Sequence, residues 1–468
     1  MGIRKFLVIL LFLGLNLASS GWATTDRVAE NQLPDDLSSL SISELKGIKL
    51  SKVTSVSRKE EKLFEAASSI FVITQEDIRR SGLLSVPELL RLVPGLEVAQ
   101  IDGNKWAITS RGFNSRFASK MLILIDGRSV YTTTYSGVFW DQIDYPLEDI
   151  ERIEVIKGPG GTLWGANAVN GVINIITKNA KDTAGGMVTA GAGNLENGFG
   201  TIRYGTKVNE DLSLRVYGKY YKRDELEGDG PIPAVDDSQS GRGGFRADWT
   251  PSKKDTLSVQ GEYFHGESGN SVPSVLTSIS PIQVATRNEI EGFRGGHILG
   301  RWNRTISKTS DMQLQLFYHR EARTAQSYQP AFHVNTYDLD FQHRFQLADQ
   351  HEMIWGVGSR FLLDKIDNTF NFSAFQSSRT NYLIGGFLQD TWTVIPDKLK
   401  LAIGTKLSVN SYTGFEFQPS GRALWTIDDK QTLWAAFSRA VRIPSRIEDG
   451  TRINLSAQPG PGGLAVLS

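Results

Sequence analysis

Few side chains in this sequence have the types and the spacing that catalysis requires. The run GPGGT at 158–162 is rich in glycine, but it lacks the Lys-Ser or Lys-Thr pair of a phosphate-binding loop. The run GESG at 266–269 misses the second glycine of a nucleophile elbow. The 6 histidines have no metal-ligand spacing, and the chain has 0 cysteines. We therefore expect no enzyme, no metal site and no cofactor.

Two other features could bind a partner through charge or through the main chain. Arg111 stands in an Arg-Gly-Phe step, and a charged side chain packed inside a domain needs an opposite charge, because an unpaired buried charge is costly. The stretch VTSVS at 53–57 lies in a polar segment, and an exposed extended segment can add as a strand to the edge of a partner's sheet. A plain linker is the alternative interpretation of 53–57.

The first residues indicate export. Arg4 and Lys5 precede an apolar run, and small residues follow it up to Ala23. This order of charge, apolar stretch and small residues is typical of a cleaved signal peptide, which we place at 1–23. An N-terminal membrane anchor is the alternative. Residues 24–58 are polar and lack a sustained period, so we expect a mobile periplasmic arm rather than a domain.

A mixed α/β pattern follows over 59–180. Thr74 can cap a short helix that stops at Gly82, and Ser85 opens a capping box with Glu88. Short apolar runs typical of strands then alternate with turns, at 121–125, 153–156 and 171–176. This stretch has enough apolar residues for a small globular core.

From about 184 to 468 apolar and polar residues alternate with the period of a β-strand. In 399–410, for example, Ile403 and Leu407 fall on one face while Lys406 and Ser408 fall on the other. Runs of about 10 residues suit a tilted membrane-spanning strand better than an ordinary one. Short connections alternate with long loops near 225–241, 267–294, 325–332 and 366–380, as in outer-membrane barrels. An exported β-sandwich is the alternative.

The charge balance excludes one class of partner. Lys and Arg number 51, and Asp and Glu also number 51, so the net charge is zero. Nucleic-acid binding needs an excess of positive charge to neutralise phosphates. We therefore expect no nucleic-acid partner.

Several motifs together resemble one family. The segment PLEDIERIEVIKGPGGTLWGANAVNGVINIITK at 146–178, SVPELLRLVPG at 85–95, Arg111-Gly112-Phe113 and LIDG at 124–127 resemble the plug of TonB-dependent outer-membrane receptors in the family's order. FSRAVRIPSR at 437–446 resembles part of the barrel. The resemblance implies a mixed α/β plug domain at 59–180, followed by an antiparallel transmembrane β-barrel over 184–468. It also implies location in the outer membrane of a Gram-negative bacterium, with outer-membrane lipid and TonB with its inner-membrane energising complex as partners.

The resemblance also implies three sets of functional residues. A latch between plug and barrel would pair Arg111 and Lys157 with barrel glutamates. At the position of Lys157 the family has a second arginine. The TonB contact would be Val53, Thr54, Ser55, Val56 and Ser57. Substrate contacts would come from outward turns of the plug, at Asn104, Trp106, Asn114, Arg116, Tyr135 and Phe139.

These residues lead to one functional hypothesis and one about completeness. We expect TonB-driven import of a ferric siderophore; cobalamin or haem import, or a plugged passive channel without energy coupling, are the alternatives. The barrel is expected to be truncated, with about 13 strands of an expected 22, because the family barrel closes with an even strand number. The first and last strands should then not pair with each other.

Overall fold

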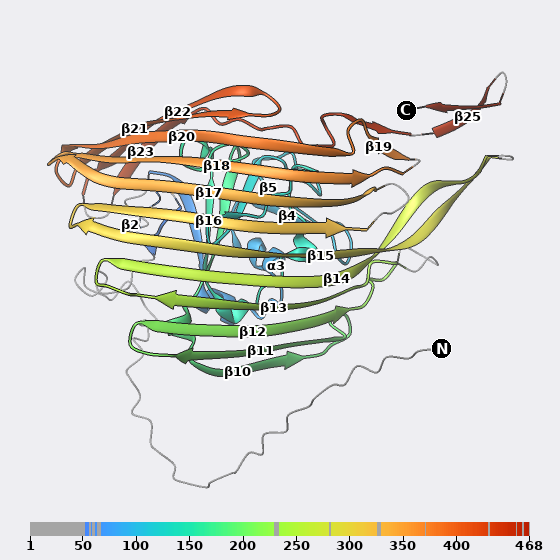
Figure 1. The fold of residues 1–468 in the computed structure, drawn as a ribbon, viewed down its shortest axis with the longest axis horizontal. Helices are drawn as coiled ribbons and strands as arrows, with labels where there is room; N and C mark the ends of the chain where they lie inside the picture. Colours follow the sequence, from blue (N-terminus) through green and yellow to red (C-terminus); the bar gives the residue numbers. More distant parts are fainter. Residues whose placement is uncertain are drawn as a thin grey trace, which may run out of the picture. The chain divides into compact units, whose positions relative to one another are not determined.

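A computed structural model describes residues 52–55, 58, 61–62, 67–228, 234–279, 282–324, 329–369, 371–428, 431–454, 456–460 and 463–467. A mixed α/β domain precedes a large antiparallel sheet, as the sequence predicts. We call residues 67–183 the plug domain and the strands from 185 to 438 the barrel sheet. Figure 1 shows the barrel strands side by side in sequence order, with the plug elements against one face of the sheet.

The plug domain is built on a five-stranded sheet with the order β3-β8-β9-β6-β7. Its strands are β3 (Ser69–Thr74), β8 (Ile150–Lys157), β9 (Gly171–Thr177), β6 (Met121–Ile125) and β7 (Arg128–Ser129). β6 and β9 run parallel, and the other pairs are antiparallel. Ile73, Ile123, Ile153 and Ile173 of these strands are at most 2% exposed and belong to the core. Burying them supplies the main stabilisation of the domain.

Short helices and one hairpin complete the plug domain. They are α2 (Gln75–Ser81), α3 (Val86–Leu89), η3 (Leu90–Leu92), η4 (Trp140–Gln142), η5 (Leu147–Asp149), α4 (Gly161–Trp164) and η6 (Ala180–Thr183), with the paired strands β4 (Leu96–Gln100) and β5 (Trp106–Ser110). The predicted caps of α2 are confirmed, whereas the capping box predicted at the start of α3 is half formed: Ser85 Oγ accepts from the Glu88 N–H at 3.5 Å, but the Glu88 carboxylate accepts from the Leu84 N–H and not from that of Ser85. Thr74 and Asp77 cap each other at the start of α2, and Gly82 ends it with φ of 67°.

Over the described residues the barrel sheet has 13 strands, and the sequence predicts about 13. They are β10 (Gly185–Gly191), β11 (Gly198–Lys207), β12 (Leu212–Arg223), β13 (Ser238–Trp249), β14 (Asp255–Ile279), β15 (Ile282–Ser307), β16 (Ser310–Arg323), β17 (Ala331–Ala348), β18 (His351–Asp367), β20 (Ser378–Ile395), β21 (Leu399–Asn410), β22 (Gly414–Thr426) and β23 (Thr432–Ser438). Every pair is antiparallel, with β10 and β23 at the two edges. Over the described residues these edge strands do not pair with each other, so the prediction of an open sheet is confirmed.

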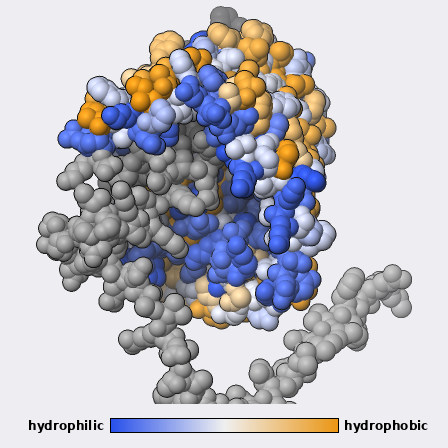
Figure 2. All heavy atoms as spheres, turned by 90° about the vertical axis from the view of Figure 1, so that its left-hand side faces the viewer, coloured by the Kyte–Doolittle hydropathy of each residue, from blue (hydrophilic) through white to orange (hydrophobic). Residues whose placement is uncertain are grey.

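The two faces of the barrel sheet differ as the period-two pattern predicts. On β21, Ile403 is 67% exposed and Leu407 is 45% exposed, whereas Ser408 and Asn410 are 4% and 3% exposed. The apolar side chains therefore point away from the plug domain, and the polar ones point towards it. Figure 2 shows the outer wall lined with hydrophobic residues and hydrophilic residues gathered in the middle of the view. An apolar outer face of long strands is what a lipid bilayer requires.

One predicted loop is wrong. The sequence predicts a long loop near 267–294, but β14 and β15 stay paired up to the partners Ile279 and Ile282. The stretch contains Pro273, which cannot donate to a ladder, and the register shifts between Val272 and Val275 accommodate it. Main-chain pairing does not depend on an alternating side-chain pattern, so this long hairpin has no signal in the sequence.

Three two-stranded sheets lie outside these parts: β1 (Lys52–Val53) with β2 (Glu61–Lys62), β19 (Phe372–Ala374) with β24 (Thr451–Ile453), and β25 (Ser456–Gly460) with β26 (Gly463–Leu467). Across the described ranges, no helix combines the length and the apolar character needed to span a membrane.

Candidate functional site

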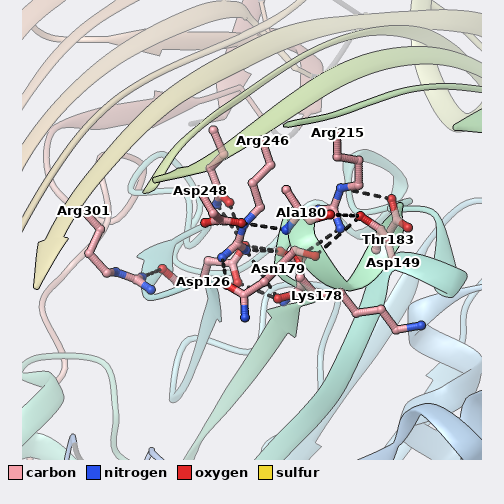
Figure 3. Close-up of polar contacts among 12 residues, drawn as sticks. Asp126, Asp149, Lys178, Asn179, Ala180, Thr183, Arg215, Arg246, Asp248 and Arg301 are labelled. Atoms are coloured by element: carbon pink, nitrogen blue, oxygen red, sulfur yellow. Dashed lines mark hydrogen bonds and ion pairs between the residues drawn. The ribbon is translucent and has the colours of Figure 1, made fainter. Parts of the chain in front are cut away.

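The strongest contacts between the plug domain and the barrel sheet join carboxylates of the plug to cations of the strands. Asp149, at the end of η5, is 1% exposed. Arg203 of β11 donates to its Oδ1 at 2.6 Å, and Nε of Arg215 of β12 lies 3.5 Å from its Oδ2. Figure 3 shows Asp149 and Arg215 facing each other across the boundary. Because all three side chains are largely buried, the ion pairs are little screened by solvent.

Asp126 forms a second junction of the same polarity, in the tight turn between β6 and β7. Its carboxylate accepts hydrogen bonds from the main-chain N–H of Thr177 at 2.9 Å and from the Gln260 side chain at 2.9 Å. Arg246 lies 4.0 Å away, and Arg301 donates to the Asp126 carbonyl (Figure 3). Burial raises the pKa of the Asp126 carboxyl, but Arg246 and the Thr177 N–H outweigh it and hold this pKa below its ordinary value.

Two further ion pairs also join a plug carboxylate to a cation of a barrel strand. Asp144 accepts from Lys219 Nζ of β12 at 2.8 Å, and Asp141 accepts from Arg323 Nη2 of β16 at 2.6 Å. We call Asp126, Asp141, Asp144 and Asp149, with their barrel cations, the acidic latch. The resemblance to the family implies the opposite polarity, in which plug cations pair with barrel glutamates.

The predicted latch residues Arg111 and Lys157 lie next to each other on the plug domain. Arg111 is exposed, and its Nη2 donates to the Lys157 carbonyl at 3.4 Å. Lys157 Nζ donates to the Pro94 carbonyl at 2.7 Å. Within the described residues neither side chain forms an ion pair with a barrel carboxylate, so the latch role of this pair stays a prediction.

The described part of the predicted TonB contact is packed against the plug sheet. Val53 and Ser55 are 0% exposed. The carboxylate of Glu154, also 0% exposed, accepts from the N–H groups of Thr54 at 3.0 Å and Ser55 at 2.8 Å. The Trp164 Nε1–H donates to the Ser55 carbonyl at 2.7 Å. The sequence predicts a mobile arm here, but this buried carboxylate gives the main chain of 54–55 a strong partner; Val56 and Ser57 lie outside the described residues.

Arg58 connects the same segment to the barrel sheet. Its Nη1 donates to Asp340 Oδ1 of β17 at 2.8 Å. Its guanidinium carbon lies 4.7 Å from the ring centroid of Trp164 and 5.0 Å from that of Phe387. Here the cation belongs to the arm and the carboxylate to the barrel, so this contact has the polarity opposite to that of the acidic latch.

Two of the predicted substrate residues are buried in packing contacts. Asn104 is 6% exposed, and its Nδ2 donates to the carbonyls of Asp236 at 3.1 Å and Gly269 at 2.9 Å. Trp106 is 8% exposed, and the Arg91 guanidinium lies 5.2 Å from its ring centroid. Asn114 is half-buried and donates to the Ala107 carbonyl at 3.3 Å. Of these three side chains, Asn114 is the most accessible to a ligand.

The remaining predicted substrate residues come together in one aromatic cluster. Tyr135 stacks on Phe117 with ring centroids 4.8 Å apart, and Phe139 lies 5.1 Å from Phe117. Arg116 is 4.0 Å from Glu291 of β15 and lies over the Phe117 ring. The sequence thus identified residues that meet in space. Arg116 and Tyr135 are half-buried, and Phe139 is 5% exposed.

A cavity of about 380 Å³ lies between the plug domain and strands β15 to β21. Its lining includes Thr54 and Arg58 of the arm, Trp164 of α4, and Lys406 of β21. We call it the seam cavity. In the described part of the chain, no group of three or more His, Asp or Glu side chains has the arrangement of a metal site.

Sequence reasoning missed Glu154, Asp126 and Asp149. A signal for Glu154 was present, because it stands between the apolar residues Ile153 and Val155 of a short run. A packed charge needs a partner, and this holds for Glu154 as it does for Arg111. Asp126 follows an apolar run and precedes Gly127, a pattern that indicates only a turn. No local pattern shows that its carboxylate would also bind a strand more than one hundred residues later.

Two family descriptions match most of the chain. Residues 62–172 match the TonB-dependent Receptor Plug Domain, and residues 177–465 match the TonB dependent receptor-like beta-barrel. The boundary between the matches falls at the end of β9, where the plug sheet ends.

Individual relatives agree with these matches. The chain is 27% identical over 400 residues, 81% of its own length, to an iron-regulated outer membrane virulence protein of Vibrio cholerae. It is 38% identical over 156 residues, 32% of its length, to the vitamin B12 transporter BtuB of Vibrio vulnificus. It spans 58% and 25% of the lengths of these two relatives.

Solved structures show a similar fold. The siderophore receptor PirA of Pseudomonas aeruginosa matches with a TM-score of 0.60 and 19% identity, covering 80% of this chain and 65% of that one. A mutant of the ferric enterobactin receptor PfeA of the same bacterium matches with a TM-score of 0.62 and 18% identity, covering 81% and 64%.

Proposed function

Because the chain belongs to the TonB-dependent receptor family, we propose that it imports a scarce nutrient across the outer membrane of a Gram-negative bacterium. The proposed substrate is a ferric siderophore, and the proposed energy source is the inner membrane, acting through TonB. Export by the signal peptide at 1–23 is part of the same proposal.

The observation that carries this proposal is the docking of residues 53–55 on Glu154. The outer membrane offers neither ATP nor an ion gradient, so work on the plug must arrive as a mechanical pull from another compartment. A pull needs a segment that is fixed to the plug and can also be released to a partner. Thr54 and Ser55 meet both needs, because a few hydrogen bonds to Glu154 and Trp164 hold them.

The released segment would then bind its partner through the main chain. The same N–H groups of Thr54 and Ser55 that donate to Glu154 become free when the arm leaves. An extended segment with free N–H and C=O groups can add to the edge of a partner sheet. This supports the proposal that 53–57 includes the TonB contact.

The relatives favour iron over cobalamin as the nutrient. The match to the iron-regulated protein of Vibrio cholerae covers 81% of this chain, whereas the match to the vitamin B12 transporter covers 32%. Substrate specificity depends on the outward plug turns together with the barrel loops, so a match that covers both regions is more informative. Cobalamin stays the second candidate because the shorter match has the higher identity.

For the substrate contacts we propose Asn114, Arg116 and Tyr135 first, because these side chains are half-buried rather than enclosed. Asn104, Trp106 and Phe139 are buried, with exposed fractions of 6%, 8% and 5%, and we assign them a packing role. Amide, guanidinium and phenol groups together suit an oxygen-rich anionic chelate.

Uptake measurements in a strain that lacks the chromosomal gene test the proposal. Each culture receives one ferric siderophore or cobalamin as its single source of iron or cobalt. Returning the natural gene to the strain should restore growth on a ferric siderophore. Deletion of residues 52–57 should abolish uptake while substrate still binds to cells. Collapse of the inner-membrane ion gradient should have the same effect. Uptake that survives both treatments would indicate a passive channel, and restored growth on cobalamin alone would replace the proposed substrate.

A further inference from the structure

The seam cavity is polar and carries more positive than negative groups. Its lining includes five cationic side chains, Arg58, Arg152, Arg301, Arg360 and Lys406, and three carboxylates, Asp126, Asp338 and Asp340. The volume of about 380 Å³ is sufficient for a small ligand. A space of this polarity and size between two packed parts needs a physical explanation, because protein interiors are otherwise closely packed.

Four of the five cations have partners of their own. Arg58 pairs with Asp340 at 2.8 Å and Arg360 pairs with Asp338 at 2.7 Å. Arg152 pairs with Glu154 at 2.8 Å. Arg301 donates to the Gln315 side chain and to the Asp126 carbonyl. Each of the three lining carboxylates therefore already has a cation beside it: Asp340 and Asp338 have the arginines just named, and Asp126 has Arg246 at 4.0 Å.

Lys406 is the exception. Within the described part of the chain it forms no hydrogen bond and no ion pair, although it is only partly exposed and lines the cavity. Its ammonium lies beside Gly165, where a Cβ would be only 3.3 Å from Nζ, so the missing side chain leaves the space that the ammonium occupies. Its Nζ also lies 5.8 Å from the centroid of the Phe387 ring. A buried cation is costly without an anion of its own, and the two carboxylates that act on this ammonium, Asp338 and Asp340, are already ion-paired with Arg360 and Arg58.

Other donors facing the same cavity also lack a partner. The Nε of Arg58 and the hydroxyl of Tyr412 are buried and make no hydrogen bond. The amide oxygens of Asn174 and Asn381 are unpartnered too, and a hydroxyl of a ligand or of its hydration shell can satisfy them. An excess of positive charge and free donors is the chemistry that recognises an anion.

We propose that the seam cavity is a binding site for a small anionic group, such as a carboxylate, with Lys406 as its principal cation. The anion neutralises the ammonium and accepts from donors that the protein leaves free. The site lies between the arm and the barrel wall, because Thr54 and Arg58 belong to the same lining. The proposed anion site does not depend on which nutrient the protein imports.

Iodide quenching of Trp164 fluorescence tests this site, because Trp164 lines the cavity. The purified chain in detergent micelles is titrated with iodide and, separately, with the neutral quencher acrylamide. The contribution of Trp164 is obtained by subtracting the signal of Trp164→Phe. In the unmodified chain, iodide should quench Trp164 more strongly than acrylamide does. Lys406→Met should reduce the iodide quenching constant about fivefold or more, since the attraction of one unit charge is lost, and should leave the acrylamide constant unchanged.

Matched variants make the result specific. Lys400→Met removes a cation from the same face of β21 outside the cavity lining and should change neither constant. Lys406→Arg should retain iodide quenching. Acetate should displace iodide from the unmodified chain, whereas dextran sulfate at equal ionic strength, which is too large to enter, should not. The proposal is overturned if Lys406→Met leaves iodide quenching intact, if neither quencher reaches Trp164, or if acetate has no effect.

Discussion

The carboxylate of Glu154 binds the main-chain N–H groups of both Thr54 and Ser55, although a hundred residues separate Thr54 from Glu154 in the sequence. The contact joins the arm to β8, an interior strand of the plug sheet between β3 and β9. Hydrogen bonds to an ionised acceptor are about twice as strong as neutral ones. Glu154 therefore holds the arm against the plug more firmly than the other contacts of 54–55 do.

Replacing Glu154 should release the arm without any substrate. Glu154→Gln removes the charge from two hydrogen bonds, each worth about 1.5–3 kcal/mol. The chain has 0 cysteines, so Ser55→Cys provides a single thiol at a position that is 0% exposed. A maleimide should label this thiol slowly in the parent and at least tenfold faster with Glu154→Gln. Glu151→Gln, on the solvent side of the same strand, is the control and should leave the rate unchanged; equal labelling in all three proteins would show that Glu154 does not hold the arm.

Asp149 should matter more for plug docking than Arg111 does. Asp149→Ala leaves Arg203 and Arg215 without their buried partner, which costs about 3–5 kcal/mol. Arg111→Ala removes one long hydrogen bond from an exposed side chain, worth at most about 1 kcal/mol. Entry of large antibiotics into cells should rise with Asp149→Ala and stay near the parent level with Arg111→Ala. If antibiotic entry rose more with Arg111→Ala than with Asp149→Ala, the result would favour a latch built on Arg111 and Lys157.

Asp126 should make the docked plug resistant to mild acid. Its pKa is held below the ordinary value of about 3.9. A carboxyl with a lowered pKa in the folded state stabilises that state above its unfolded pKa, and this contribution disappears as the pH falls through the folded pKa. The denaturant midpoint of the plug should therefore keep the Asp126 contribution at pH 5 and lose it only well below pH 4. Asp126→Asn should remove this acid step, while Asp211→Asn, in an exposed turn, should preserve it.

Asn104 and Asn114 should respond differently to replacement. Asn104→Ala leaves buried carbonyls of Asp236 and Gly269 without a donor, so the free energy of unfolding should fall by about 1–3 kcal/mol. Asn114→Ala removes a single bond of 3.3 Å and should change stability little, while substrate affinity should fall. Calorimetry of the purified chain and binding of labelled substrate to cells measure the two effects. A binding defect confined to Asn104→Ala would reverse these roles.

Local patterns in the sequence are sufficient to predict helices and strands, but they do not predict the contacts between these elements. The alternation over 399–410 predicts which face of β21 carries Ile403 and which carries Ser408, because the period of a strand is two. Thr74 and Gly82 predict both ends of α2 from cap chemistry alone. The acidic latch could not be predicted, because it depends on which strand passes Asp149 after folding. A resemblance to a family suggested a latch of the opposite polarity, at residues that this structure leaves on the plug surface.

The order of strands has a consequence for how the chain folds. Every barrel strand pairs with the next barrel strand along the chain, so the sheet can grow one hairpin at a time through contacts between neighbouring segments. The plug sheet differs, because Phe71 of β3 pairs with Val155 of β8, and this pairing closes a longer loop than a barrel hairpin does. Its mean sequence separation between contacts is correspondingly larger, which slows folding. We therefore expect the plug core to consolidate late and the barrel hairpins to form early, an order opposite to that of the two parts in the sequence.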